Sequence, residues 1–148
     1  MKKTKISDFK GEYGFLSNFY NTDIVYKGLV YPNAEAAFQA QKCIAEEAKL
    51  KYTQKMNPYI AKQLGKREPD LPNNWKDISY TIMLDIIRIK FENPILRQKL
   101  IATGDAFLEE GNTWHDNKWG HCKCSKCQNK KVENLLGKIL MQVRNEII

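Results

Sequence analysis

Three polar residues, Glu35, Gln39 and Lys42, recur at helical spacing in a segment rich in alanine. At positions i, i+4 and i+7 of a helix they lie within roughly 60° of one another around the axis. Such a face can be a solvated surface. It can also be the polar wall of a cleft, in which Glu35 orients a sugar hydroxyl or water while Lys42 contacts a phosphate or an electrophilic sugar carbon. A lysine with a lowered pKa forms Schiff bases through its unprotonated amine.

An aromatic segment precedes these residues. Phe15 and Phe19 flank Ser17 and Asn18, so the rings can stack on a planar base while the hydroxyl and amide read its edge. The same segment can instead be an aromatic anchor that pins the N-terminal part of the chain to the core. Both interpretations fit the residue types.

Three of the four cysteines fall within a short stretch, Cys122, Cys124 and Cys127, directly after His121. Thiolate and imidazole are the ligands that zinc prefers, and His115 is a further candidate. Structural zinc sites usually draw their ligands from two separated pairs, however, and this cluster is compressed. We therefore expect cysteines that occupy a variant loop, with no metal, and keep zinc as the alternative.

The irregular stretch between Gly104 and Lys131 holds both histidines and two of the three tryptophans. Long loops of this kind are more often functional than idle. Asp116 can act as a catalytic carboxylate here, or its side chain can shape the loop as an Asx-turn. Trp119 can stack on a base or ribose, or pack in the core.

The last predicted helix carries Asn134 and Gly137 one turn apart. A glycine costs a helix about 1 kcal/mol relative to alanine, so the close approach of another backbone or of a ligand would explain Gly137. Arg144 can clamp a phosphate, or form an ion pair near the C-terminal end.

The elements that must position these residues can be read from turn signals and hydrophobic periodicity. Paired apolar runs around Lys27-Gly28 predict a β-hairpin over 20–31, and Asn33 can cap a helix over about 34–44. Further helices are expected in four places: from Pro58 to about Gly65, from Trp75 as a largely buried element, over 94–102, and from about Lys131. The fold class predicted is α+β and mainly α, as one domain over 1–148 with a small β-hairpin.

Composition narrows the class of protein. Lys and Arg number 24 against 17 Asp and Glu, a net charge of +7, and 43% of the residues are hydrophobic. This favours a folded chain with anionic partners such as nucleotides or nucleic acid. The first residues lack the apolar run of a secretory signal, and no segment is apolar enough to span a membrane. We expect a cytoplasmic protein with reduced thiols.

Taken together, several segments resemble the YbiA-like proteins, also called NADAR for their association with NAD and ADP-ribose. The matching stretches follow one order along the chain: Phe15–Phe19, Tyr31–Lys42, Thr103–Asp105 with Leu108 and Glu110, Asp116–Gly120, and Asn134–Gly137 with Leu140, Met141, Val143 and Arg144. The resemblance departs after Gly120, where a glycine-rich turn is usual and this chain has a Cys-rich insertion over about 121–131.

The resemblance implies an N-glycosidase that acts on ADP-ribosylated bases or on phosphorylated ribosyl intermediates of riboflavin synthesis. Lys42 would form an imine with the opened ribose, and Glu35 and Asp116 would be its acidic partners. The residues expected to contact substrate are Phe15, Ser17, Asn18, Phe19, Gln39, Glu110, Trp119, Gly120, Asn134 and Arg144. The alternative is a non-catalytic, basic, zinc-stapled module that binds nucleic acid or ADP-ribose.

Overall fold

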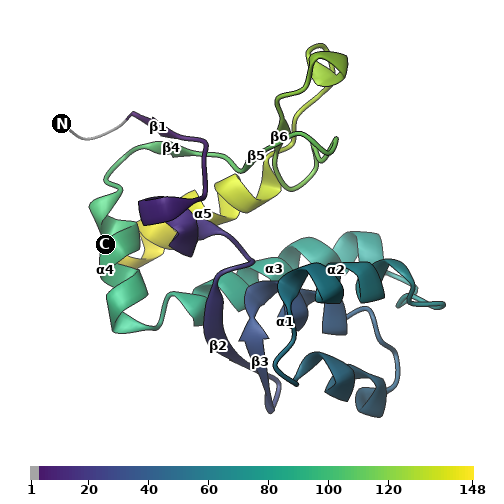
Figure 1. The fold of residues 1–148 in the computed structure, drawn as a ribbon. Helices are drawn as coiled ribbons and strands as arrows, with labels where there is room; N and C mark the ends of the chain where they lie inside the picture. Colours follow the sequence, from purple (N-terminus) through teal and green to yellow (C-terminus); the bar gives the residue numbers. More distant parts are fainter. Residues whose placement is uncertain (1–3) are drawn as a thin grey trace. The chain divides into compact units, whose positions relative to one another are not determined.

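The computed structural model describes residues 4–148 and has an α+β fold in which helix predominates (Figure 1). The α-helices are α1 (Ala34–Ala40), α2 (Pro58–Lys66), α3 (Trp75–Lys90), α4 (Pro94–Ala102) and α5 (Leu135–Ile147). The strands are β1 (Lys5–Ile6), β2 (Asn21–Tyr26), β3 (Leu29–Asn33), β4 (Phe107–Leu108), β5 (Gly111–Asn112) and β6 (His121–Cys122). Short 3-10 helices are η1 (Gly11–Leu16), η2 (Glu46–Tyr52) and η3 (Ser125–Cys127). The predicted fold class is confirmed.

The chain divides into two compact units, each with its own elements. The terminal unit contains the residues through Ser17 together with Pro94–Ile148, and the middle unit contains Asn18–Asn93. Each strand pair that the structure describes lies within one unit: β1 with β4 and β5 with β6 in the terminal unit, β2 with β3 in the middle unit.

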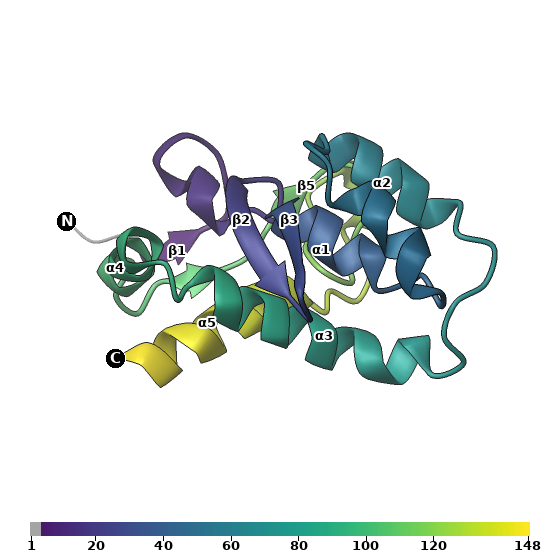
Figure 2. The ribbon, with the colours of Figure 1, turned by 90° about the horizontal axis from the view of Figure 1, so that it is seen from below.

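The predicted hairpin is present in the middle unit as antiparallel β2 and β3 (Figure 2). Lys27 and Gly28 form its turn with φ values of 49° and 86°, the left-handed geometry that matches strand twist in two-residue hairpins. Alternate residues Ile24 and Tyr26 of β2 are buried, as is Tyr31 of β3. The hairpin packs this face against α1 and α3.

Helix α1 begins as predicted, because the Asn33 side chain accepts a hydrogen bond of 2.8 Å from the Ala36 amide. Its end differs from the prediction. After Ala40 the amides bond to carbonyls three residues back rather than four, as in the 3.1 Å bond from Lys42 N to Gln39 O. Ile44, the last residue of the predicted helix, is 65% exposed, so burial of its side chain does not stabilise a longer helix.

Helix α2 has the predicted start, with Pro58 in its first turn and Asn57 as its cap. Helix α3 is less buried than expected: its inner face, Met83, Ile86 and Ile87, is covered, whereas Trp75 is only half-buried. The hydrophobic period located the helix correctly and overestimated how much of it is covered.

In the terminal unit, β1 and β4 pair in parallel with Ile6 opposite Leu108, and α5 packs on β4 and α4. Helix α5 begins at Leu135 rather than near Lys131, because Asn134 adopts a left-handed φ of 51°. The amide of Leu135 donates to Lys118 O at 2.9 Å, and the amide of Leu136 donates to Trp119 O at 3.1 Å. The loop after β5 therefore caps this helix.

Candidate functional site

A buried polar cluster lies at α1 in the middle unit. Glu35, Gln39 and Asn18 are 8%, 6% and 7% exposed. The Gln39 side chain donates from Nε2 to Glu35 Oε1 at 3.1 Å, and the Glu35 amide donates to the Asn18 carbonyl at 3.0 Å. The interpretation of Glu35 and Gln39 as a solvated face is therefore wrong.

Two amide oxygens of this cluster, Asn18 Oδ1 and Gln39 Oε1, have no hydrogen-bond partner among residues 4–148. The Asn18 amide nitrogen donates to the sulfur of Met83, at 3.5 Å. Buried acceptors are nearly always paired in folded proteins, and leaving one unpaired costs about 1–3 kcal/mol. Such acceptors fit the hydroxyl or N–H donors of a bound ligand.

Gly65 gives Gln39 its space. A Cβ atom at Gly65 would overlap the Gln39 side-chain oxygen, so the side chain can reach Glu35 only because α2 carries a glycine there. The sequence suggested Gly65 merely as the end of a helix. A spacing of 26 residues gives no local signal of this contact.

Lys42 stands in the turn after α1 and is half-buried. It does not occupy the seventh position of a continuous helix, so the predicted common helical face for Glu35, Gln39 and Lys42 is wrong. Its backbone remains tied to the helix through the bond to Gln39 O. Its role in an imine stays a prediction.

The aromatic segment is largely packed. Phe15 is 3% exposed, and Lys99 Nζ lies 5.8 Å from its ring centroid. This burial fits an anchor better than a stacking platform. Phe19 is half-buried and meets Tyr59 edge-on at 4.7 Å between centroids, while Ser17 ends η1 by donating its amide to Gly14 O.

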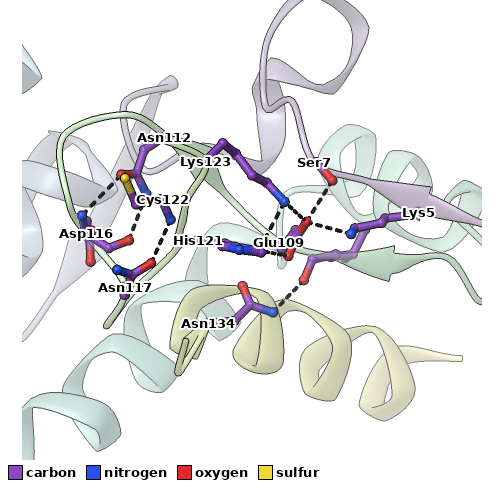
Figure 3. Close-up of polar contacts among 11 residues, drawn as sticks. Lys5, Ser7, Glu109, Asn112, Asp116, Asn117, His121, Cys122, Lys123 and Asn134 are labelled. Atoms are coloured by element: carbon purple, nitrogen blue, oxygen red, sulfur yellow. Dashed lines mark hydrogen bonds and ion pairs between the residues drawn. The ribbon is translucent and has the colours of Figure 1, made fainter. Parts of the chain in front are cut away.

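Asp116 shapes its own loop in the terminal unit (Figure 3). Its Oδ1 accepts from the amides of Trp119 at 2.9 Å and Lys118 at 3.1 Å, which is the Asx-turn foreseen as one alternative. Trp119 is half-buried, with Lys118 Nζ at 5.6 Å from its ring. A catalytic role for the Asp116 carboxylate stays a prediction.

Asn112 organises the same loop and was missed in the sequence. Its Nδ2 donates to Asp116 O at 2.8 Å, and its Oδ1 accepts from the Asp116 and Trp114 amides. Gly120 is required beside it, since a Cβ there would overlap the Glu110 carbonyl. The Glu110 side chain is half-buried.

Glu109, also missed in the sequence, is the centre of a charged network (Figure 3). Its Oε1 meets Lys123 Nζ at 2.6 Å, Lys5 Nζ at 3.0 Å and Ser7 Oγ at 3.0 Å, and its Oε2 lies 2.9 Å from His121 Nδ1. Burial by itself would raise the pKa of Glu109, but these hydrogen bonds outweigh it and lower the pKa to about 2.

The cysteine cluster selects a different histidine from the one expected. His115, Cys122, Cys124 and Cys127 bring their ligand atoms within 4.8 Å of one another, whereas His121 faces Glu109. Adjacent residues of a strand point to opposite sides, and His121 and Cys122 form β6. This group can hold a metal ion.

Two of the predicted residues, Asn134 and Gly137, lie at the start of α5. Asn134 donates from Nδ2 to Leu108 O at 3.0 Å, and its Oδ1 has no partner in the described part of the chain. A Cβ at Gly137 would overlap that same Leu108 carbonyl. The expected close approach of another backbone to Gly137 is confirmed.

Arg144 is buried, and its Nη1 donates to Thr103 Oγ1 at 3.0 Å. Burial lowers the pKa of Arg144, and the nearby charge of Asp105 opposes that shift. The side chain is thus held inside the unit by residues of the predicted Thr103–Asp105 motif. Its contact with a phosphate stays a prediction.

Comparisons with known proteins agree with this fold and these residues. The NADAR domain matches residues 6–148, which span both units. An N-glycosidase of Nostoc punctiforme is 33% identical over 140 residues, covering 91% of this chain and 86% of its own. The NMR structure of the Escherichia coli protein YbiA superposes with a TM-score of 0.82 at 31% identity, covering 99% of this chain and 87% of that one.

The chain belongs to the NADAR domain family, as its sequence motifs predicted. Together with the Nostoc relative, this membership supports its assignment to the N-glycosidase class of hydrolases. No helix within residues 4–148 has the length and apolar character to cross a membrane.

Proposed function

We propose that this protein hydrolyses the N-glycosidic bond between ribose and a base in ADP-ribosylated or phosphorylated ribosyl substrates. The observation that carries the proposal is the buried Glu35 carboxylate, held by Gln39 and lying beside unpartnered amide oxygens. Breaking an N-glycosidic bond develops positive charge at the anomeric carbon, and a fixed carboxylate in a dry environment stabilises that charge strongly.

Glu35 has a second use in the same step. A carboxylate whose position is fixed can orient a water or a ribose hydroxyl and take its proton, which typically contributes about 10²–10⁴-fold to the rate. The free oxygens of Asn18 and Gln39 suit ribose hydroxyl donors. The cluster therefore supports a sugar-facing role for these three residues.

Lys42 is proposed as the nucleophile. Its amine adds to the anomeric carbon while the bond from that carbon to the base breaks and the base leaves with a proton. The ribose ring opens, leaving an imine between Nζ and the carbon and a hydroxyl where the ring oxygen was. Water then adds to the imine carbon and releases free sugar and lysine.

Arg144 of the terminal unit is proposed as a phosphate ligand. In the same unit Lys118, Lys130 and Lys131 line a pocket of about 570 Å³ together with Glu133. Asp116 is proposed as a further acid. The remaining predicted contacts, Phe15, Ser17, Phe19, Glu110, Trp119, Gly120 and Asn134, are proposed to shape or line the substrate site.

The test is a panel of substrates read by mass spectrometry of the liberated sugar and base: ADP-ribosylated guanine in DNA, ribosylamino-pyrimidine phosphates, and NAD. Lys42→Ala is expected to lose at least about 10²-fold in kcat and to lose a borohydride-trapped adduct. Exposed Lys55→Ala is the matched control. A Lys42→Ala protein with the wild-type rate would overturn the imine.

Glu35→Gln separates the charge from the shape of the cluster, and exposed Glu47→Gln is its control. The amide retains a hydrogen-bonding oxygen while the negative charge is lost. We expect kcat to fall by about 10²-fold or more with normal folding. Unchanged turnover would remove Glu35 from the chemistry.

The second candidate is a binding module without catalysis, favoured by the exposed lysines Lys118, Lys123, Lys126, Lys130 and Lys131. It predicts polynucleotide affinity that falls steeply with salt, with no base released from any member of the panel. We further propose one functional domain spanning the chain and residence in the cytoplasm, where its four free cysteines stay reduced.

A further inference from the structure

Four potential ligand atoms converge in the loop after β5. His115 Nδ1 lies 3.3 Å from Cys127 Sγ, 3.4 Å from Cys124 Sγ and 3.9 Å from Cys122 Sγ. The sulfurs of Cys122 and Cys124 are 3.3 Å apart. One nitrogen and three sulfurs therefore lie close enough together to surround a single metal ion.

These separations can be compared with those of a tetrahedral metal site. Zinc binds sulfur at about 2.3 Å and imidazole nitrogen at about 2.0–2.1 Å. In a regular tetrahedron these bonds place two sulfurs about 3.8 Å apart, and sulfur and nitrogen about 3.6 Å apart. The distances of 3.3–3.9 Å from His115 Nδ1 to the three sulfurs lie within about 0.3 Å of the tetrahedral nitrogen–sulfur value. The Cys122–Cys124 distance of 3.3 Å is about 0.5 Å shorter than the tetrahedral sulfur–sulfur value, whereas a disulfide requires about 2.05 Å.

The backbone holds the ligands in place without the metal. Cys122 is fixed by β6, and its amide donates to Asn117 Oδ1 at 2.8 Å. Cys124 precedes η3 and Cys127 is its last residue, and the Cys127 amide donates to Cys124 O at 3.1 Å. His115 adopts a left-handed φ of 69°, a conformation that non-glycine residues adopt only when their surroundings impose it.

The surroundings suit a metal–thiolate group. Cys122 and Cys127 are 2% and 1% exposed, so their bonds to a metal would be shielded from water. One divalent ion with three thiolates carries a net charge of −1, and exposed Lys118, Lys123 and Lys126 belong to the same loop. Ligand softness and number match zinc in its closed Cys₃His form.

We propose that His115, Cys122, Cys124 and Cys127 bind one structural Zn²⁺ ion that fastens the loop over 112–127. All four coordination positions belong to the protein, so the ion has no open position for substrate. Its ligand His115 directly precedes Asp116, and the backbone amide of its ligand Cys122 donates a hydrogen bond to Asn117 Oδ1. Zinc thereby fixes the loop whose carbonyls cap α5.

The test uses the full chain, purified with a reductant, and does not depend on enzyme activity. We expect one zinc per chain by elemental analysis, and visible cobalt–thiolate absorption when Co²⁺ replaces it. His115→Ala and Cys124→Ser are expected to weaken metal binding at least about tenfold. His121→Ala and Cys43→Ser, the matched controls, keep full zinc content.

Removal of zinc from the wild-type chain gives a second readout that needs no variant. A strong chelator is expected to lower the melting temperature and to speed hydrogen exchange at amides of residues 112–127, with recovery when Zn²⁺ is restored. Substoichiometric zinc with no cobalt–thiolate band would overturn the proposal. So would zinc retained equally by Cys124→Ser, or a Cys122–Cys124 disulfide in place of metal. An inactive enzyme with full zinc would count only against the proposed function.

Discussion

Glu109→Gln is the substitution for which the structure gives the most complete expectation. The Glu109 carboxylate is 4% exposed and is contacted by the side chains of Lys5, Lys123, His121 and Ser7. Its pKa falls from 4.5 to about 2, and a shift of this size corresponds to an upper bound of about 3 kcal/mol of stability. The two lysines are 51% and 41% exposed, so solvent screening reduces the expected loss to about 1–2 kcal/mol.

The pH dependence has a definite sign. Because the pKa of Glu109 is lower in the folded state, its contribution is complete above about pH 4.5 and is lost as the pH falls toward 2. The difference in unfolding free energy between wild type and Glu109→Gln should therefore be fully present at pH 7. It should shrink progressively below pH 4.5.

Urea denaturation at a series of pH values measures this difference, and urea is preferred because it does not screen charge. Exposed Glu12→Gln is the control and should change stability by less than about 0.5 kcal/mol. Equal midpoints for wild type and Glu109→Gln at pH 7 would refute the reasoning. A difference that persists unchanged at pH 2.5 would refute it as well.

Three further substitutions or reactions test the packing. Gly137→Ala should lower stability by about 1–3 kcal/mol, although alanine normally favours a helix, because its Cβ would overlap Leu108 O; Gly14→Ala, with open space around it, is the control, and thermal melts decide. Asn33→Ala should cost about 1–2 kcal/mol through loss of the α1 cap, and unaltered stability in urea would contradict that role. Burial raises the pKa of Cys43 to about 11, so iodoacetamide should label this thiol at pH 8 roughly 10²-fold more slowly than a free thiol. The labelling rate, followed by mass spectrometry, should rise about tenfold per pH unit. Fast labelling of the folded protein at pH 8 would contradict this prediction.

Local signals were enough for much of the fold. The Lys27-Gly28 turn, the Asn33 cap and the Asn57-Pro58 start depend on residues within four positions of one another, so their physics is present in any short window of sequence. Helix ends depend on more distant contacts. Helix α1 ends at Ala40, short of the predicted Ile44, whose side chain is exposed in the packed structure.

The sequence by itself determined the family, the order of the main elements, and the presence of an amine, several carboxylates and a cysteine cluster. Only the tertiary structure decided which of these carboxylates and histidines come together with their partners. Glu109 rather than Glu110 is buried in the charged network, and His115 rather than His121 joins the cysteines. Neighbouring residues in extended chain face opposite sides, so a shift of one position would exchange Glu109 with Glu110, or His121 with Cys122. That register is set by contacts as distant as the 102 residues between Ser7 and Glu109, which no local pattern encodes.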